Sequence, residues 1–287
     1  MPYSYVVADV FTDAAYGGNP LAVLPDDGGL SDAQMQAIAK EFNLSETTFV
    51  TPGSAPGRFR VRIFTPGTEL PFAGHPIVGT AIVLQSLGRT APAETVFELN
   101  VGPVRVELAP GRATFFRDGP PDLAPPPLPD AQLAALVGAG RLAGPAMQAG
   151  YGTNFLMLPL PDLAALAAAR LRLDLWQEAA PSLVARGVYA HVVLGAEAGT
   201  TRVRARMFGP SLGVGEDPAT GSAAAGLAGW LPGPDGTHRI AIEQGVEMGR
   251  PSLIRATATR AAGAVAGISI GGGAVVVAEG RLLHLPS

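Results

Sequence analysis

Two short stretches of the chain place a polar residue at what we expect to be the start of a helix of small residues. The first is "ELPFAGHPIVGTA", residues 69–81, and the second is "EDPATGSAAAGLA", residues 216–228. In each, an acid is followed five residues later by a glycine and then by His75 or Ser222. The first turn of a helix carries unpaired N–H groups and a partial positive charge, so it attracts anions. The pattern predicts a site that holds a small carboxylate and moves a proton beside it.

The two stretches belong to a longer internal repeat. Residues 62–81 and 206–228 both read R-x-F-x-P, a spacer, and then E-x4-G-[HS]-x3-G-x-A, with one three-residue insertion in the second copy. Self-similarity at a fixed offset indicates repeated structure, so we expect two similar domains, each with a strand, an acidic loop and a central helix. Glu69 and Glu216 occupy matching places in the two copies, which favours loop or capping roles over chemistry.

Short runs of β-branched and aromatic residues bounded by Gly and Pro surround these helices. In the first half we expect strands at 4–11, 18–25, 46–52, 58–66, 94–102, 103–111 and 112–117, and helices at 31–43 and 74–88. In the second half we expect helices at 131–140 and 161–173, and strands at 154–160, 189–195 and 273–285. This pattern predicts two β-rich α+β domains.

A change in composition suggests where the domains meet. Residues 119–130 contain six prolines and are a candidate linker. The expected domains are therefore 1–118 and 131–287, with the last strand of the chain as a candidate to return to the N-terminal domain.

Composition, net charge and missing motifs exclude several classes of protein. The chain has 287 residues, of which 47% are hydrophobic and 15% charged, as in compact globular proteins. A net charge of −4 gives no basic surface for nucleic acid or an anionic membrane. The chain has no cysteine, no run of 18 apolar residues and no signal-peptide pattern. No metal-ligand spacing or nucleotide-binding loop is recognisable. We expect a cytoplasmic protein that binds neither nucleic acid nor membrane.

Five motifs together resemble the PhzF-like family of phenazine-biosynthesis isomerases. They are "GGNPLAV", "NLSETTFV", "FAGHPIVGTA", "GEDPATGSAAAG" and "EQGVEMGRPS", and they follow one another from residue 17 to residue 252. The resemblance implies an α+β fold of the diaminopimelate epimerase type. In it, two pseudo-symmetric domains each wrap a β-barrel-like sheet around a central helix, with the active site in the cleft between them. It also implies a homodimer that uses no cofactor and no metal.

The resemblance also assigns candidate site residues. The family's catalytic roles fall on Glu46, His75 and Asp217, and substrate binding falls on Gly74, Gly221 and Ser222. Asn19, in "GNP", is a turn residue and a candidate substrate contact. Related epimerases place a cysteine at both helix starts, where this chain has His75 and Ser222. That difference argues against racemisation by two thiols and for an isomerase with one carboxylate base.

The expected chemistry sets conditions on these residues. A base at Glu46 needs a pKa raised toward neutrality by burial, while a helix start would keep His75 neutral. Ser222 is also a candidate helix cap.

The sequence thus predicts a cofactor-independent isomerase that shifts a proton on a small carboxylate-bearing metabolite. Two alternatives stay open. One is an epimerase or racemase of an amino or hydroxy acid. The other is a non-catalytic member of the fold that binds a ligand or a protein partner.

Overall fold

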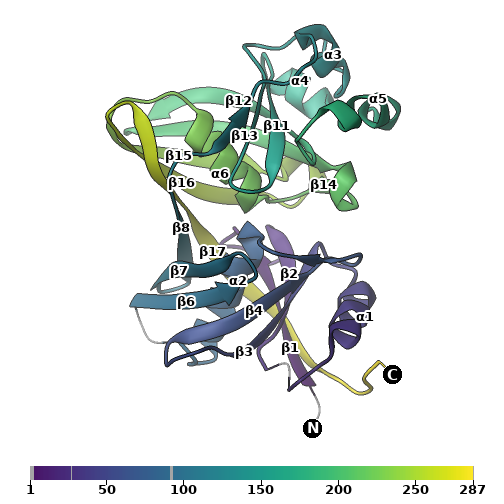
Figure 1. The fold of residues 1–287 in the computed structure, drawn as a ribbon, viewed down its shortest axis with the longest axis vertical. Coiled ribbons are helices and arrows are strands. Elements are labelled where there is room, and N and C mark those ends of the chain that lie inside the picture. The colour runs from purple at the N-terminus through teal and green to yellow at the C-terminus, as the bar shows by residue number, and fades with distance from the viewer. Residues whose placement is uncertain (1–2, 27, 91–92, 287) are drawn as a thin grey trace. The chain divides into compact units, whose positions relative to one another are not determined.

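The computed structural model describes residues 3–26, 28–90 and 93–286, and Figure 1 shows its elements. The chain forms two compact units. The first runs as far as Phe116 and takes in the chain again from Gly271, and the second runs from Arg117 to Ile270. Within the described ranges, no helix combines the length and the apolar character that crossing a membrane requires.

The first unit is a closed barrel with one helix inside and one outside. Its elements are β1 (Tyr3–Val10), β2 (Asn19–Leu24), α1 (Asp32–Phe42), β3 (Glu46–Pro52), β4 (Arg58–Phe64), β5 (Glu69–Leu70), α2 (Gly74–Ser86), β6 (Ala93–Leu99), β7 (Gly102–Ala109), β8 (Arg112–Asp118) and the end of β17 (Ala264–Leu282). Eight strands pair in the order β1, β2, β3, β4, β6, β7, β8 and β17, and β17 pairs again with β1. The pairs β2–β3 and β4–β6 are parallel, and the connections between their strands contain α1 and α2.

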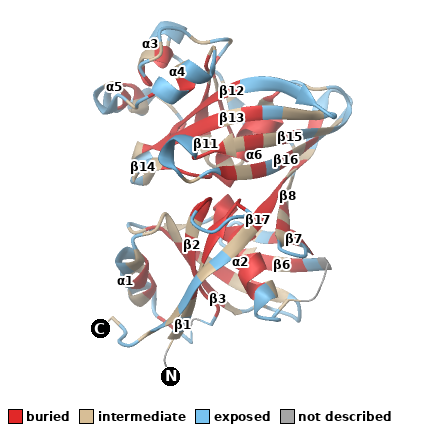
Figure 2. Ribbon diagram, turned by 180° about the vertical axis from the view of Figure 1, so that it is seen from behind, coloured by how far each residue is buried: buried red, intermediate tan, exposed pale blue. Residues whose placement is uncertain are grey.

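The inner helix α2 is the predicted central helix. Every residue from Gly74 to Leu84 is buried, and the helix contacts β1, β2, β3 and β7. Figure 2 shows it in the colour of buried residues. A helix that is apolar on all sides needs partners on all sides, which a barrel provides. The fit is close, since a Cβ at Gly79 would lie 2.6 Å from two side chains of β1 and β2.

The second unit repeats this plan. Its elements are β9 (Asp122–Ala124), α3 (Asp130–Ala135), β10 (Met147–Gly150), β11 (Asn154–Pro159), α4 (Leu163–Ala168), α5 (Leu173–Ala179), η1 (Ala180–Ser182), β12 (Val188–Glu197), β13 (Thr200–Gly209), η2 (Pro210–Leu212), β14 (Val214–Asp217), α6 (Gly221–Trp230), β15 (Gly236–Gln244), η3 (Val246–Met248) and β16 (Ser252–Ala261). The pairs β11–β12 and β13–β15 are parallel, and β12–β13, β13–β14 and β15–β16 are antiparallel. These pairings match those of β2 to β7, and α6 takes the place of α2. The predicted repeat is therefore confirmed, and the fold is of the α+β, diaminopimelate epimerase-like class.

The repeat is visible in matching ion pairs. Arg62 donates through Nε and Nη2 to the carboxylate of Glu69, at 2.8 and 2.7 Å. Arg206 donates in the same way to Glu216, at 2.7 and 2.8 Å. In both units the guanidinium also lies over the ring of the phenylalanine two residues further along the strand, 5.1 Å from its centroid. Each pair ties a short strand, β5 or β14, to the barrel just before the central helix. The sequence favoured loop or capping roles for both acids, but the structure places them in short strands, where they pair with arginines.

Two local expectations were wrong. The candidate linker 119–130 contains β9, which pairs with β10. Prolines lack the N–H that a sheet needs, and those at 120–121 and 125–127 restrict this pairing to three residues.

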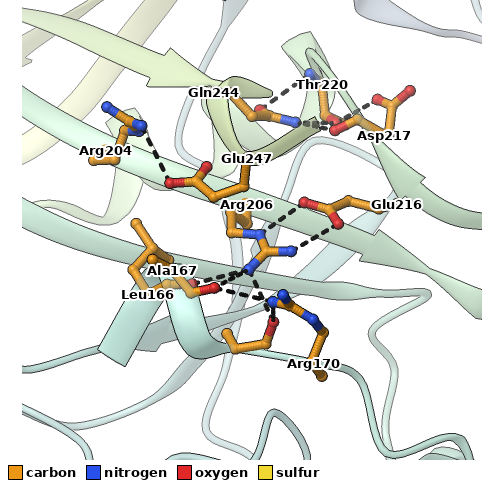
Figure 3. Close-up of polar contacts among 11 residues, drawn as sticks. Leu166, Ala167, Arg170, Arg204, Arg206, Glu216, Asp217, Thr220, Gln244 and Glu247 are labelled. Carbon is orange, nitrogen blue, oxygen red and sulfur yellow. Dashed lines mark hydrogen bonds and ion pairs between the residues drawn. The ribbon is translucent and has the colours of Figure 1, made fainter. Parts of the chain in front are cut away.

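The helix expected at 161–173 ends at Ala168, and a new helix begins at Leu173. Arg206 Nη1 donates to the carbonyls of residues 166, 167 and 169, at 3.0, 3.1 and 2.8 Å, and so stabilises the end of α4 (Figure 3).

Candidate active site

The first unit brings together three of the predicted site residues. Asn19 is the first residue of β2, Glu46 is the first of β3, and His75 is the second of α2. Because β2 and β3 are parallel, with Leu21 opposite Glu46, both strands begin at the same end of the barrel. His75 Nε2 lies 3.3 Å from Glu46 Oε2, and Asn19 Nδ2 lies 3.3 Å from His75 Nδ1.

Burial sets the protonation of His75. Its side chain is 4% exposed, and burial lowers its pKa to about 3, so the ring is neutral at pH 7. The sequence led us to expect a neutral histidine because of the helix start, but burial is the cause found here. An amide nitrogen only donates hydrogen bonds, so Asn19 makes Nδ1 the acceptor and the ring proton is on Nε2. The contact with Glu46 is thus one between an N–H group and a carboxylate, not an ion pair.

The second unit brings together the other predicted residues. Asp217 is the last residue of β14, and Gly221 and Ser222 are the first two of α6. Thr220 donates a hydrogen bond from its hydroxyl to Asp217 Oδ2 at 2.5 Å, and Asp217 is 6% exposed (Figure 3). Gln244 donates from Nε2 to the main-chain oxygen of Asp217 at 2.8 Å.

The starts of the two central helices are built alike. Gly74 and His75 open α2, as Gly221 and Ser222 open α6. The residue before each helix makes no side-chain hydrogen bond to its first turn. The expected capping role of Ser222 is wrong, since Thr220 is at the N-cap position and directs its hydroxyl to Asp217. Helix starts without a side-chain cap keep their positive potential for an anion.

Glu46 and His75 have no counterparts of the same residue type in the second unit. In the second unit the strand matching β3 begins at Val188, opposite Leu156 of β11, and Val188 is fully buried. The residue before it is Gly187, where a Cβ would lie 2.5 Å from a main-chain oxygen of β13. Val188 thus stands where the first unit has Glu46, and neither this position nor the one before it holds an acid. At the helix start, Ser222 replaces His75.

Sequence reasoning missed Thr220, Gln244 and Tyr189 as members of the second group. Tyr189 and Gln244 are fully buried, and the Tyr189 hydroxyl donates to Gln244 Oε1 at 3.1 Å. The signal for Gln244 was available, because it lies in the motif "EQGVEMGRPS". Among the residues that the structure describes, no cluster of three or more His, Cys, Asp or Glu side chains could hold a metal ion.

The chain is similar to isomerases over nearly its whole length. A family model described as phenazine biosynthesis-like protein (PhzC-PhzF) matches residues 8–280. An uncharacterized isomerase of Mesorhizobium japonicum is 42% identical, with 97% of this chain and 98% of that protein covered. The trans-2,3-dihydro-3-hydroxyanthranilate isomerase of Pseudomonas aeruginosa is 38% identical, with 97% and 99% covered. A PhzF-family phenazine biosynthesis protein of Bacillus anthracis has the same fold, with a TM-score of 0.89, 22% identity, and 99% and 100% of the chains covered.

Proposed function

The chain belongs to the phenazine biosynthesis-like (PhzC-PhzF) family and is an isomerase, and we propose that it shifts a proton on a small carboxylate-bearing metabolite without a cofactor. In this proposal Glu46 is the acid/base, and His75 and Asp217 assist. The substrate is held by the main-chain amides near Gly74, Gly221 and Ser222 and by the side chain of Asn19.

The observation that carries the proposal is the contact between Glu46 and the neutral His75, at 3.3 Å. The Glu46 carboxylate takes a proton from one carbon of the substrate, and the electron pair of that C–H bond enters the adjacent double-bond system. The proton exchanges with solvent while it resides on Glu46, and Glu46 then delivers a proton to a second carbon, so one C–H bond breaks, another forms, and no oxidant is needed. His75 Nε2 lies 3.3 Å from Glu46 Oε2 and so stays beside the glutamate while it gains and loses its proton. Helix-start amides offset the negative charge of the substrate carboxylate.

The unequal repeat favours this reaction over two-base racemisation. A racemase that uses two equivalent bases needs a proton-transfer group in each copy of the repeat. Here the place of Glu46 is taken by Val188 and that of His75 by Ser222, and Asp217, the acid of the second unit, stands at the end of β14, which is not the place of Glu46. The two units therefore do not supply equivalent bases.

The named relatives suggest the substrate class. Trans-2,3-dihydro-3-hydroxyanthranilate isomerases of Pseudomonas aeruginosa and Pseudomonas chlororaphis are 38% and 35% identical to this chain. We propose that the substrate is likewise a small unsaturated carboxylate with a ring C–H next to a double bond. The proposed homodimer rests on the resemblance to the family, and the proposed cytoplasmic location rests on composition. Light scattering of the purified protein tests the dimer.

Deuterium uptake tests the reaction. Wild type, Glu46→Gln and Glu41→Gln are incubated in heavy water with a library of small carboxylates, including dihydro-hydroxyanthranilate, and products are analysed by mass spectrometry. Glu41 is exposed on α1 of the same unit, so its substitution is the matched control. We expect uptake by wild type and the control, and a loss of about 100-fold or more for Glu46→Gln.

Three other results of the deuterium experiment would contradict the proposal, each in a different way. Undiminished uptake by Glu46→Gln would refute the assignment of the base. Deuterium entering a stereocentre with loss of chirality would favour an epimerase. If wild type takes up no deuterium with any candidate, the proposal that it isomerises such carboxylates is overturned and a ligand-binding role is favoured.

A further inference from the structure

We propose that Gln244 is a positioning residue, which turns the hydroxyl of Thr220 so that its proton is donated to Asp217. The inference rests on the proposed function in one respect, the assisting role of Asp217. It comes from the hydrogen-bond circuit of the second unit. Figure 3 shows three of its members, Asp217, Thr220 and Gln244, and the fourth, Tyr189, lies on β12.

Main-chain groups fix the orientation of the Gln244 amide. The N–H of Thr220 can only donate, and it points to Gln244 Oε1 at 3.2 Å. The carbonyl of Asp217 can only accept, and it lies 2.8 Å from Gln244 Nε2. These two contacts decide which end of the amide is oxygen and which is nitrogen. The Tyr189 hydroxyl supplies the second donor to Oε1, and burial raises the pKa of Tyr189, so it keeps its proton.

The amide in turn fixes the direction of the Thr220 hydroxyl. Gln244 Nε2 donates its second hydrogen to Thr220 Oγ1 at 3.0 Å, which occupies a lone pair of that oxygen. The single proton of the hydroxyl must then point elsewhere, and Asp217 Oδ2 lies 2.5 Å away. All four hydrogen-bonding positions of the Gln244 amide are therefore used, and every bond in the circuit has one direction.

This circuit has a consequence for Asp217. Its Oδ2 is occupied by a donor that cannot turn away, so a proton that Asp217 accepts is carried on Oδ1. The same bonds hold the loop from Asp217 to Thr220, which fixes the plane of the carboxylate. Gln244 thus controls both the geometry of Asp217 and the oxygen that takes part in proton transfer, without contacting the substrate.

Replacing Gln244 with glutamate tests this directly, because the shape is kept and the donor is lost. The introduced carboxylate still accepts from Thr220 N–H and Tyr189, but it turns the Thr220 hydroxyl toward itself and away from Asp217. The matched control is Gln148→Glu. Gln148 is also buried in the second unit, where its Oε1 accepts from two main-chain N–H groups at 2.8 and 3.0 Å.

The kinetic readout is deuterium exchange into the substrate of the wild type. We expect Q244E to lower kcat about 10–100-fold with little change in KM, and Q148E to leave both close to the wild-type values. The activity of Q244E should rise as the pH falls, because the introduced carboxyl regains a donor when it is protonated. T220V should lose activity to a similar degree, T220S should retain more of it, and adding Q244E to T220V should cost little more. A wild-type rate for folded Q244E, or additive losses in the double variant, would overturn the proposal.

A structural readout separates this proposal from the proposed function. Crystal structures of wild type, Q244E and Q148E report the separation of Thr220 Oγ1 from Asp217 Oδ2 without any substrate. We expect the hydrogen bond to be broken in Q244E only, and its survival in Q244E would overturn the positioning role. Absence of exchange in wild type would instead count against the proposed reaction and leave this structural result standing. If Q244E does not fold, the comparison of T220V with T220S tests the proposal instead. Equal activity of these two variants would show that the Thr220 hydroxyl is dispensable and would overturn the proposal.

Discussion

Neutralising the acid of each repeated ion pair should destabilise the two units unequally. The side chains of Arg206 and Glu216 are 4% and 20% exposed, against 19% and 25% for Arg62 and Glu69. Glu216→Gln leaves a buried guanidinium without a counter-charge, which costs about 3–5 kcal/mol in other proteins. The three main-chain oxygens that accept from Arg206 remain, so we expect about 3 kcal/mol. After Glu69→Gln, Arg62 keeps its contact with Asp32 at 2.5 Å, and we expect about 1 kcal/mol.

The distribution of tryptophan makes the comparison measurable. Both tryptophans of the chain, Trp176 and Trp230, lie in the second unit, so fluorescence follows the unfolding of that unit. We expect Glu216→Gln to lower the fluorescence-detected Tm by about 6–12 °C, at about 2–4 °C per kcal/mol. Glu69→Gln should shift the circular-dichroism transition by about 2–4 °C and leave the fluorescence transition near its wild-type position. Equal losses in the two variants, or a larger loss for Glu69→Gln, would refute the reasoning from burial.

Two further measurements test buried positions. Burial lowers the pKa of His75 to about 3 and that of His191 to about 4, whereas the ordinary value in an unfolded chain is 6.5. Between the folded and the unfolded pKa of each histidine, the unfolded chain therefore binds more protons than the folded one. The free energy of unfolding should therefore fall as the pH drops below about 6.5, by about 1.4 kcal/mol per pH unit for each histidine. Denaturant titrations from pH 7 to 5 measure this slope, and an unchanged slope in His191→Asn would contradict the assignment. Gly226→Ala should cost about 1–3 kcal/mol, because its Cβ would lie 2.6 Å from a main-chain oxygen of β10. Gly79→Ala should cost less, because at the same 2.6 Å it meets only side-chain carbons, and a Tm series that ranks the two the other way would contradict this.

The sequence predicted most where a feature is local or repeated. The two central helices follow from runs of small apolar residues after Gly74 and Gly221, and both were found. The matching places of Glu69 and Glu216 in the repeat correspond to matching ion pairs, although loop or capping roles were expected. The glycine run at 271–273 packs closely, since a Cβ at Gly273 would lie 2.5 Å from Asp13 Oδ1.

What the sequence did not predict depends on partners far away along the chain. Arg206 stabilises the end of α4 from 37 or more residues away, so the apolar pattern of 161–173 alone read as one continuous helix. The contact of Asn19 with His75 spans 56 residues and joins the start of β2 to the start of α2. Gln244 reaches Thr220 across 24 residues, through the end of β15. Local propensity carries no information about such pairings.

The path of β17 determines the order in which the units can be completed as the chain is synthesised. This strand supplies the last barrel position of the first unit, with Leu282 opposite Tyr3 at the other end of the sequence. Until residues 271–282 leave the ribosome, β1 and β8 are exposed edges, although every other strand of that barrel has already been made. The second unit, which ends at Ile270, has its full sequence earlier. The unit whose strands are made first is thus the last to close, and its open edges need protection from other chains while the whole second unit is being made.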